Sequence, residues 1–475
     1  MLSKTDFLFY LDAPMHLWAR AHDQLEKQTP TPMERHLSQQ GQQVEALAKQ
    51  YIETNLLPKY RQGQLLWQPA YDDGRYKIRA DALIYSQDAA AYDLYEIKSS
   101  TSVRTEHEYD LAFQVLLLET LLNLRHVFVI HINKAYQQGQ ILDIENFFII
   151  EPLSEQIAKR RDRVASARLE AYAVTLMPSP KPEFACTKPK SCPCPALCHP
   201  DLLKHSIYDI PYLGKKAKDL RERGITNLKD VPESFKLNAT QKKHLRAAQS
   251  GQPIIDHAAI QSSLASLEYP LYFLDYETFN PAVPLYPNYH PYEHIVFQYS
   301  LFRIECPGNE PQHYEKLVTN QADPAPQILL HLLSNLGKKG SVIVWNQSFE
   351  KQRNQDLAKH CPRFTEQLLG INHRLYDLMR IFKVGHYVHA DFHGSASLKA
   401  VLPVLCPELG YQELDISSGE QAMLTWFDLY TGKIPPEERA GVENAMKIYC
   451  KMDTYGMIAI LNKLLEILRR YREHQ

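Results

Sequence analysis

YDLYEIKSST, residues 92–101, is the stretch from which the fold of the first half of the chain follows. Its apolar and aromatic residues indicate a β-strand, in which Glu96 and Lys98 lie two positions apart. Residues two apart on a strand share a face, so both charged side chains point the same way. Burying such a pair costs free energy unless the charges have partners or a chemical role. The pair is therefore either a structural salt bridge at the sheet edge or half of a metal site.

The preceding residues extend this strand into a hairpin. YKIRADALIY (76–85) and YDLYEIK (92–98) predict two strands joined by the turn SQDAAA (86–91). Pairing about this turn places Asp81 opposite Glu96, within reach across the two strands. Two carboxylates repel each other there unless a cation lies between them. With Lys98 they form a set whose hard oxygens suit Mg²⁺ or Mn²⁺, and the lysine can orient or help deprotonate an attacking water.

Length and composition bound the class of protein. A chain of 475 residues with 44% hydrophobic and 23% charged residues predicts a globular protein of two or three domains. Lys159 to Arg246 holds nineteen Lys or Arg against nine Asp or Glu. This basic zone fits a nucleic-acid enzyme or a solvated helical surface, and both interpretations stay open. The first residues form no signal peptide and no run is long enough to span a bilayer, so we expect a cytoplasmic protein without a membrane partner.

The order of the elements predicts an α/β protein in three parts. Residues 1–200 alternate helical and strand patterns around a mixed sheet, and residues 201–265 form a helical connector. Residues 266–475 begin a new α/β pattern. In this last part LYFLDYET, IVFQYSLFRI and HYEKLVT predict three strands, followed by a helix and the strand SVIVWN. That order resembles the RNase H-like fold.

Residues 1–200 resemble the PD-(D/E)XK nucleases, in particular the RecB-like branch with iron–sulfur clusters among CRISPR-associated exonucleases. The resemblance rests on LSKTDFLFYLDAPMHLW (2–18), GQQVEALA (41–48), ADALIY (80–85), YEIKSST (95–101) and Gln114. It implies a restriction-endonuclease-like fold and a catalytic set of Asp81, Glu96, Lys98 and Gln114. Many relatives have a histidine where this chain has Glu45, which is then a further cation ligand. The family's tyrosine four residues after Gln114 is Leu118 here.

Four cysteines lie together in CTKPKSCPCPALC, residues 186–198. In a reducing compartment such a cluster indicates metal or iron–sulfur ligation, although four small residues in a proline-rich loop remain the simpler alternative. In the iron–sulfur branch one N-terminal cysteine joins three C-terminal ones around a [4Fe–4S] cluster. Ala13 occupies the N-terminal position here. We therefore expect Cys194 to replace the missing ligand, beside Cys186, Cys192 and Cys198, around a cluster or Zn²⁺.

A second set of acidic residues lies in the last part of the chain. LYFLDYETFN places Asp275 and Glu277 on one strand face, and Glu350 begins a helix after the strand VIVWN. Tyr449 and Asp453 lie four apart on one helical face. This order resembles the DnaQ-like exonucleases of the DEDDy type. The resemblance implies two divalent ions held by the four carboxylates, a water-positioning Tyr449 and 3′-to-5′ exonuclease activity.

Two further features extend these resemblances. The family's third acid is normally aspartate, and Asp356 is a less favoured substitute for Glu350. HGSASLKAVLP (393–403) and PAVPLYPNYHPYEHIVFQYSL (281–301) resemble a bacterial family, described as a domain of unknown function, that joins the two nuclease halves. PYLGKKAKDLRERGITNLKDV (211–231) resembles a helix–hairpin–helix, whose glycine turn offers backbone N–H groups to phosphate. A plain helical connector is an equal alternative.

The sequence thus predicts a divalent-metal-dependent nuclease with two sites. Single-stranded DNA is the favoured substrate because an exonuclease site needs a frayed end, and RNA stays possible. The rival interpretation is a nucleic-acid-binding scaffold in which one or both sites are inactive. The departures at Ala13, Leu118 and Glu350 support this rival.

Overall fold

The computed structural model describes residues 1–25 and 29–474, which form two compact units. The first unit contains Met1–Pro200 and the insert Pro281–Glu293, and the second contains Asp201–Asn280 and the residues from His294 onward. The helical segment 201–265 is thus part of the second unit. Helices and mixed sheets occur in both units, so the mixed α/β class expected from the sequence is confirmed.

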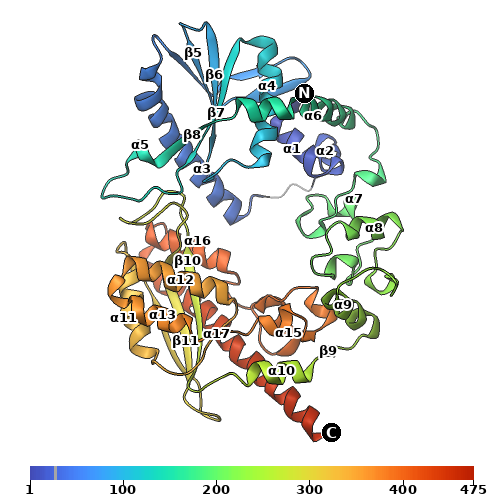
Figure 1. Cartoon of the computed structure of the whole chain (residues 1–475), viewed down its shortest axis with the longest axis vertical. Helices are drawn as coiled ribbons and strands as arrows, with labels where there is room; N and C mark the ends of the chain where they lie inside the picture. The colour runs from blue at the N-terminus through green and yellow to red at the C-terminus, as the bar shows by residue number, and fades with distance from the viewer. Residues whose placement is uncertain (26–28, 475) are drawn as a thin grey trace. The chain divides into compact units, whose positions relative to one another are not determined.

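The first unit is built around a five-stranded mixed sheet and a smaller three-stranded sheet (Figure 1). Its helices and strands are, in chain order, β1 (Leu2–Ser3), α1 (Lys4–Asp12), α2 (Pro14–Ala21), α3 (Pro32–Tyr51), β2 (Gln64–Trp67), β3 (Ala70–Asp72), β4 (Tyr76–Arg79), β5 (Ala82–Ser86), β6 (Ala91–Lys98), α4 (Thr105–Leu121), β7 (Leu124–Ile132), α5 (Ile144–Phe147), β8 (Phe148–Pro152), α6 (Ser154–Thr175) and α7 (Pro195–Cys198).

The large sheet of this unit has the strand order β2-β5-β6-β7-β8, with β5 antiparallel and β7 parallel to β6. Ala82 pairs with Tyr95 and Leu83 with Leu94, and continuing this register brings Asp81 opposite Glu96, as expected. The stretch 76–85 is not one strand, however. It divides at Ala80 and Asp81 into β4, which joins the smaller sheet, and β5. This break frees the Asp81 carboxylate to accept a hydrogen bond from the backbone N–H of Ile97 (2.8 Å).

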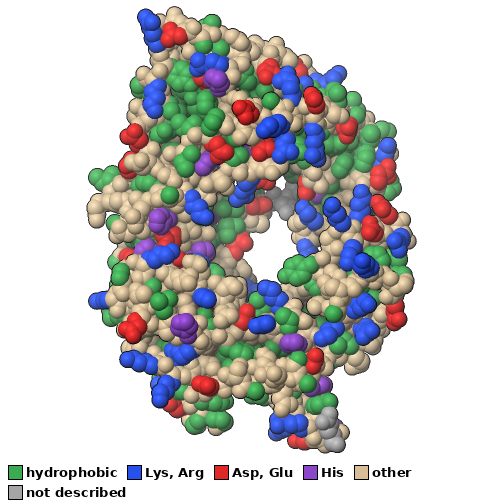
Figure 2. Space-filling view, viewed as in Figure 1, with side chains coloured by type: hydrophobic (Ala, Val, Ile, Leu, Met, Phe, Trp, Pro, Cys, Tyr) green, Lys and Arg blue, Asp and Glu red, His purple; other side chains and the backbone are tan. Residues whose placement is uncertain are grey.

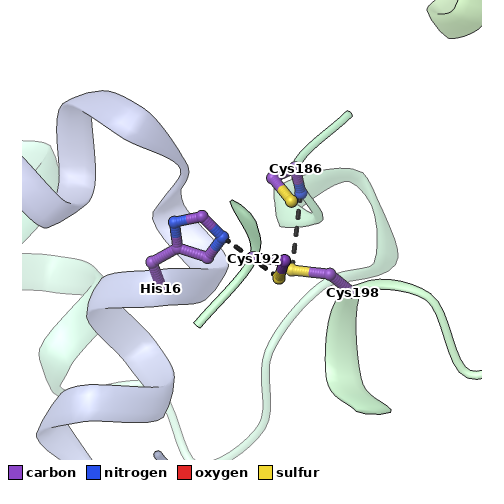
Figure 3. Close-up of side chains that lie close together, drawn as sticks. All are labelled: His16, Cys186, Cys192 and Cys198. Atoms are coloured by element: carbon purple, nitrogen blue, oxygen red, sulfur yellow. Dashed lines mark hydrogen bonds between the residues drawn. The ribbon is translucent and has the colours of Figure 1, made fainter. Parts of the chain in front are cut away.

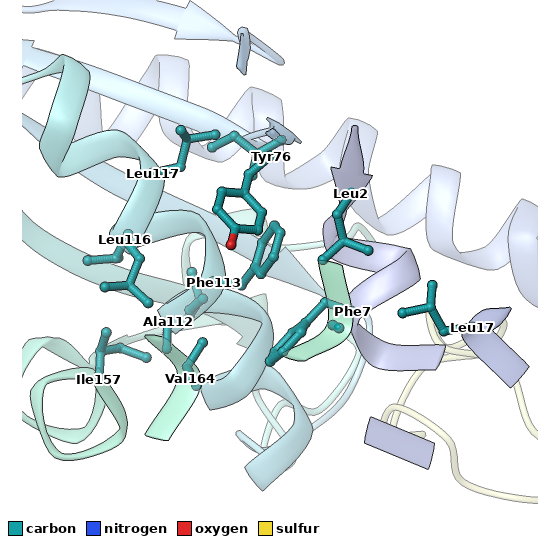
Figure 4. Packing of buried hydrophobic residues seen from close by; sticks show 14 of the residues in the cluster. Leu2, Phe7, Leu17, Tyr76, Ala112, Phe113, Leu116, Leu117, Ile157 and Val164 are labelled. Carbon is teal, nitrogen blue, oxygen red and sulfur yellow. The ribbon is translucent and has the colours of Figure 1, made fainter. Parts of the chain in front are cut away.

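Helix α4 lies at the centre of the core of the first unit. Ten of its residues are buried, and it packs against α6, α1 and the small sheet. Figure 4 shows Phe113 between Phe7 and Tyr76, with ring centroids 5.1 and 5.8 Å away. Burying an aromatic side chain of this size contributes about 1.5–3 kcal/mol, so these contacts fix α1 and α4 against the sheet. Both helices carry charged side chains to the end of β6.

The second unit contains a second five-stranded mixed sheet and a two-stranded one. Its helices and strands are, in chain order, α8 (Lys216–Glu222), α9 (Ala239–Ser250), β9 (Ile254–Ile255), α10 (His257–Leu264), β10 (Leu271–Phe279), β11 (Ile295–Ile304), β12 (Gln312–Leu317), α11 (Pro324–Asn335), β13 (Val342–Val344), α12 (Gln347–His360), α13 (Thr365–Asn372), β14 (Leu375–Asp377), α14 (Arg380–Lys383), β15 (Tyr387–Val388), α15 (Leu398–Leu405), α16 (Gly419–Tyr430) and α17 (Pro436–Glu473).

The large sheet of the second unit has the order β12-β11-β10-β13-β14. Strands β10, β11 and β12 form the expected antiparallel meander, and β13 lies parallel to β10 after the expected helix α11. The long helix α17 packs across β10 and β11 and ends near the C-terminus (Figure 1). The central strand β10 and the helix α17 thereby face each other over several turns, which positions the polar residues of both.

The helical segment 201–265 carries many of the basic side chains of the chain. Figure 2 shows Lys and Arg side chains over the region of α8 and α9, where Lys215, Lys218 and Arg223 are exposed. Gly224 ends helix α8: it has a φ of +73°, and the N–H of Ile225 donates to the carbonyl of Leu220. Gly214 lies in the turn before α8. None of the described helices is both long and apolar enough to cross a bilayer.

Candidate functional site

The acidic residues of the second unit meet between β10 and α17. Strand β10 supplies Asp275 and Glu277, and α17 supplies Tyr449, Cys450 and Asp453. One ligand atom each from Asp275, Glu277 and Cys450 lies within 4.8 Å of the others, and the Cys450 thiol donates to Asp275 Oδ2 at 3.7 Å. Residues 275 and 277 share a strand face, and 449, 450 and 453 share one side of a helix. Packing α17 on β10 therefore brings both sets together.

Two tyrosines fix the position of Asp453. The hydroxyl group of Tyr411 donates to Asp453 Oδ1, and Tyr411 and Tyr449 both act to lower the pKa of this carboxyl against the effect of burial. A Cβ atom at Gly419 would lie 3.6 Å from Glu277 Oε2 and 3.7 Å from the Tyr449 hydroxyl, so these two atoms face the same point. The structure thus brings Asp275, Glu277, Tyr449 and Asp453 into one cluster, here called the second-unit cluster.

Burial without ionic partners dominates the electrostatics of this cluster. Burial raises the pKa of Asp275 well above its usual value, and the charge of Asp453 raises it further. The pKa of Glu277 is raised by burial and then by Asp275. Among the described residues, no lysine, arginine or histidine forms an ion pair with Asp275, Glu277 or Asp453. The charge of Lys399 acts on these carboxylates, and the pKa of this lysine is lowered by burial although the carboxylates oppose the shift.

Glu350, at the start of α12, interacts electrostatically with Asp275 of the cluster. It is buried, its Oε2 atom has no hydrogen-bond partner among the described residues, and burial and the charge of Asp275 raise its pKa well above the usual value. Asp356, the alternative third acid, accepts hydrogen bonds from Arg353 (2.7 Å) and Lys359 (3.1 Å). Its charge is therefore already compensated. Glu350 is the acid left without a partner.

Three residues around the second-unit cluster were not predicted from the sequence: Lys399, Tyr411 and Cys450. Cys450 lies between Tyr449 and Asp453 on α17, three residues before Asp453, so the helical period offered a signal for it. Lys399 Nζ lies 5.1 and 5.0 Å from the ring centres of Tyr411 and Tyr449. Nothing in the local sequence marks Lys399 or Tyr411, because only packing brings α15 and the 406–418 loop to α17.

The charged residues of the first unit form a different kind of cluster at the end of β6. Lys98 Nζ donates to Glu96 Oε1 and to Asp110 Oδ2, each at 2.8 Å. Gln114 Nε2 donates to Glu96 Oε2 at 3.0 Å. The Asp81 carboxylate lies beside them and accepts the Ile97 N–H. The structure thus brings Asp81, Glu96, Lys98 and Gln114 together. These four residues, with Lys4 and Asp110, are here called the first-unit cluster.

Lys4 and Asp110 are the members that the sequence did not reveal. Lys4 is the first residue of α1, and its Nζ atom donates a hydrogen bond of 2.9 Å to Glu96 Oε1. Asp110 precedes Gln114 by four residues on α4, so helical spacing could have indicated it. Burial by itself raises the pKa of Glu96, but Lys98 and Lys4 outweigh burial and lower this pKa to about 2. Burial and the charge of Glu96 raise the pKa of Asp81 to about 7.

Glu45 lies on α3 and points to a neighbouring loop. Gln68 donates a hydrogen bond to Glu45 Oε1, and the backbone N–H of Gln68 donates to the Asp81 carbonyl at 2.9 Å. The described residues show no direct contact of the Glu45 side chain with the Asp81 or Glu96 carboxylate. Leu118, at the position of the family tyrosine, is fully buried in the core. Glu45 therefore contacts the loop that holds Asp81 rather than the cluster itself.

The cysteine cluster includes a histidine from the start of the chain. One ligand atom each from His16, Cys186, Cys192 and Cys198 lies within 4.8 Å of the others. Figure 3 shows the His16 ring directed at Cys192, with Nε2 3.5 Å from the sulfur, and the Cys186 N–H donating to Cys198 Sγ at 3.4 Å. Three cysteines and one histidine form a donor set that can hold a metal ion or cluster.

The fourth ligand of this set is a histidine and not Cys194, which was expected at this position from the sequence. Cys194 lies outside it, although its sulfur is 3.8 Å from that of Cys198. His16 on α2, three residues after Ala13, occupies the place instead. Its Nδ1 atom lies 2.8 Å from Asp12 Oδ2, which leaves Nε2 for a metal, as is usual for metal-binding histidines. Burial raises the pKa of the Cys192 thiol to about 12, so thiolate formation requires a cation.

Comparisons with known proteins yield distant relatives. Residues 272–397 match the model of DUF2779, a domain of unknown function. The chain is 25% identical over 215 residues to the uncharacterized protein MG366 of Mycoplasma genitalium, which covers 42% of this chain and 32% of that protein. It is 24% identical over 297 residues to the uncharacterized protein UU173 of Ureaplasma parvum, 56% of this chain and 42% of that protein. The chain therefore spans less than half the length of these relatives.

Among solved structures, the chain is similar to the one described as the crystal structure of SSO0001. The two sequences are 17% identical, the match covers 42% of this chain and 87% of that chain, and its TM-score is 0.23.

Proposed function

We propose that this protein is a divalent-metal-dependent nuclease that hydrolyses phosphodiester bonds, with a 3′-to-5′ exonuclease site in the second unit. The observation that carries the proposal is a set of four carboxylates whose pKa values are raised by burial and that form no ion pair among the described residues. Asp275 is partly buried, and Glu277, Glu350 and Asp453 are buried. Such groups are stable as anions only next to a cation. The strand order of the second unit, a meander with two parallel strands beside its first strand, is similar to that of RNase H-like enzymes and supports the same proposal.

The residues of the second-unit cluster and Glu350 have distinct roles in this proposal. The four carboxylates would hold Mg²⁺ or Mn²⁺, which supply an activated water and stabilisation of the leaving oxygen when bound. Tyr449, held beside Asp453 and facing the same point as Glu277, orients the attacking water. Lys399 interacts electrostatically with these carboxylates, so its positive charge is placed to attract a phosphate group that binds at the same site. Tyr411 is a positioning residue, because it acts through Asp453.

The proposal also includes a second nuclease site, in the first unit. Asp81 and Glu96 would hold the cation there, with Lys98 and Gln114 beside them and Glu45 acting through the adjacent loop. Lys4 and Lys98 already contact Glu96, so a cation has to displace at least one of these hydrogen bonds. This arrangement supports a PD-(D/E)XK-like site whose occupation depends on a rearrangement of Lys4. It equally fits the structural salt bridge that the sequence left open.

Single-stranded DNA is the substrate that we propose, with RNA as the alternative. An exonuclease site must receive a strand end that is not paired. The basic segment with Lys215, Lys216 and Lys218 offers contacts to phosphates, which carry no sequence information. The rival function, a nucleic-acid-binding scaffold with inactive sites, makes the same use of this segment but needs no carboxylate.

The test is digestion of single strands labelled at the 5′ or the 3′ end, with Mg²⁺, Mn²⁺ or chelator. We expect early release of the 3′ label as a mononucleotide, and a loss of at least about 10³-fold in Asp275→Asn, because a metal ligand contributes several kcal/mol to the transition state. The matched control is Glu366→Gln, an exposed carboxylate on α13. Internal cuts that vanish in Glu96→Gln would assign the activity to the first unit. No cleavage of DNA or RNA with either metal would support the scaffold.

For the cysteine set we propose a single Zn²⁺ ion, with a [4Fe–4S] cluster as the alternative. A tetrahedral zinc ion with Zn–S bonds near 2.3 Å separates its sulfur ligands by about 3.8 Å, and the four donor atoms here lie within 4.8 Å of one another. The group would link α2 to the 186–198 loop and so stabilise the fold of the first unit. Metal analysis and the absorbance near 400 nm after anaerobic purification distinguish the two. A colourless protein without zinc would contradict both.

A further inference from the structure

The histidine-rich stretch HYVHADFHG, residues 386–394, takes no part in the two carboxylate clusters or the cysteine set. Two of its side chains, Asp391 and His393, meet His205, which precedes the short helix η5 (Ile207–Asp209). One ligand atom from each of the three residues lies within 4.8 Å of the others. All three belong to the second unit, and the segment 390–392 forms the short helix η8 (Ala390–Phe392).

We propose that His205, Asp391 and His393 bind a zinc ion that joins η5 to η8. Imidazole nitrogens and a carboxylate oxygen are ordinary zinc ligands, and three protein ligands leave a fourth position for water or a further group. His205 Nε2 lies 3.4 Å from Asp391 Oδ1. Zinc bonds of 2.0–2.1 Å in a tetrahedron separate neighbouring ligand atoms by about 3.3 Å, so this pair already has the spacing that zinc requires.

A buried carboxylate orients the third ligand. His393 Nδ1 lies 3.2 Å from Asp209 Oδ2, and Asp209 is 6% exposed. The same oxygen accepts the backbone N–H of Ser206 at 3.2 Å, which fixes the carboxylate. With Nδ1 directed at Asp209, Nε2 is the nitrogen through which His393 would bind a cation. A carboxylate behind a ligating histidine is the usual support of a zinc site.

The backbone also holds His393 in an uncommon conformation beside Asp209. His393 has a φ of +49°, a left-handed conformation in which histidine is uncommon, and Gly394 follows with a φ of +70°. A Cβ atom at Gly394 would lie 2.2 Å from the carbonyl oxygen of Asp209, so glycine is required where the two segments cross. Strained residues persist where the surrounding structure fixes them, and they concentrate at functional sites. The packing of Ala390 on the core around Ile207 and Ile210 supplies that fixation.

One positive charge competes with a cation at this site. Lys204 Nζ and His205 Nε2 lie 3.0 and 3.4 Å from Asp391 Oδ1, yet neither contact is aligned as a hydrogen bond. The Lys204 side chain is 73% exposed, and exposed salt bridges contribute at most about 1 kcal/mol, so zinc can displace it. His389 is not a ligand through Nδ1, because that atom accepts the backbone N–H of Asp391 at 3.1 Å.

The test is equilibrium zinc binding by the full chain, with zinc buffered by a chelator and counted by elemental analysis. We expect the double variant His205→Ala/His393→Ala to bind one equivalent of zinc less than the unchanged protein. Zinc X-ray absorption should show the sulfur contribution of the cysteine set unchanged and a smaller nitrogen contribution. The control His373→Ala, an exposed histidine, should keep the full stoichiometry.

Asp209→Asn provides a second variant that keeps the shape of the site and the cap of η5. Loss of the carboxylate behind His393 should weaken zinc binding at this site by about 10- to 100-fold without changing the number of sites at saturation. Equal stoichiometry and equal affinity in the double variant and the unchanged protein would overturn the proposal. Loss of zinc in both the double variant and His373→Ala would overturn it as well, because the effect would then not be specific to the site.

Discussion

The two carboxylate clusters of this protein balance their charges in opposite ways. In the first unit, Lys4 and Lys98 contact Glu96 at 2.9 and 2.8 Å, and the pKa of Glu96 is lowered to about 2. In the second unit, Asp275 and Glu277 have no ion-pair partner among the described residues, and their pKa values are raised well above normal. Similar residue types thus give one cluster in which two lysines compensate Glu96, although the pKa of Asp81 beside it is raised to about 7. In the other cluster no ion pair compensates the carboxylates among the described residues.

Metal binding is expected to contribute more to the stability of the second unit than to that of the first. A compensated cluster stabilises its unit in the absence of metal and gains less from a cation, which must displace a lysine. An uncompensated cluster destabilises its unit until a cation binds.

Removal of Lys98 should break the first-unit cluster. Lys98→Met leaves Glu96 and Asp110 buried with one lysine fewer, and loss of one partner of a buried ion pair costs about 3–5 kcal/mol. Hydrogen exchange at peptides of β6 and α4 should accelerate by at least about 10²-fold. Lys77→Met, on the exposed face of β4, is the control and should change little. Unchanged exchange in Lys98→Met would show that this cluster is not compensated by Lys98.

Addition of Mn²⁺ should stabilise the second unit more than the first. At a concentration a hundred times its dissociation constant, a ligand that binds only the folded state contributes about 2.7 kcal/mol. Exchange in β10 and α17 should therefore slow by about 10²-fold, and a chelator should reverse the effect. Asp275→Asn should abolish most of this protection, whereas Glu366→Gln should retain it. Greater protection of β6 than of β10 would reverse the comparison.

The stability of the metal-free second unit should fall as the pH rises from 5 to 8. Because the pKa values of Asp275 and Glu277 are raised in the folded state, folding retains protons that the unfolded chain releases above its ordinary carboxyl pKa near 4. Exchange of β10, corrected for its intrinsic pH dependence, should accelerate several-fold, and less so in Asp275→Asn. The effect of Glu96 on stability has the opposite dependence on pH. Its stabilising contribution to the first unit is present above about pH 4.5 and is lost as the pH falls toward 2. A flat profile for β10 would contradict the uncompensated cluster.

Replacement of Lys399 should have the smallest effect. Lys399 is exposed and acts on the charges of Asp453, Glu277 and Asp275, but it donates its hydrogen bond to the Ser417 carbonyl at 2.7 Å. Lys399→Met should destabilise the metal-free second unit by less than about 1 kcal/mol, as for a partly screened charge. The control is Lys433→Met, whose lysine pairs with the exposed Asp428. A loss comparable to that of Lys98→Met would mean that Lys399 compensates the second-unit cluster after all.

Local patterns were sufficient for the elements that carry the sites. The hairpin register follows from one turn, and it places Asp81 opposite Glu96. The spacing of Asp275 and Glu277 on a strand, and of Tyr449 and Asp453 on a helix, fixes the side from which each pair points. These relations depend on the period of a single element, so the sequence specifies them. The break of the strand at Ala80 and Asp81 was missed, since it depends on pairing with two different sheets.

Residues that approach from distant segments could not be predicted. Lys4 reaches Glu96 across 92 positions, and Tyr411 reaches Asp453 across 42. His16 takes the position that the sequence suggested for Cys194, because α2 packs against the end of α6 and places its ring at the cysteines. No local period encodes such contacts.

The α/β class, the strands and helices that carry the acids, and the paired carboxylates of both clusters therefore follow from the amino-acid sequence. Whether each charge has a partner, and that a histidine joins the cysteines, depends on the tertiary structure. Hydrophobic burial brings α1 to β6 and α17 to β10, and the side chains that happen to accompany these helices differ. Lys4 arrives at Glu96 and helps to lower its pKa. Tyrosines, a cysteine and the more distant Lys399 arrive at Asp275 and Asp453, where burial raises the pKa of both carboxylates.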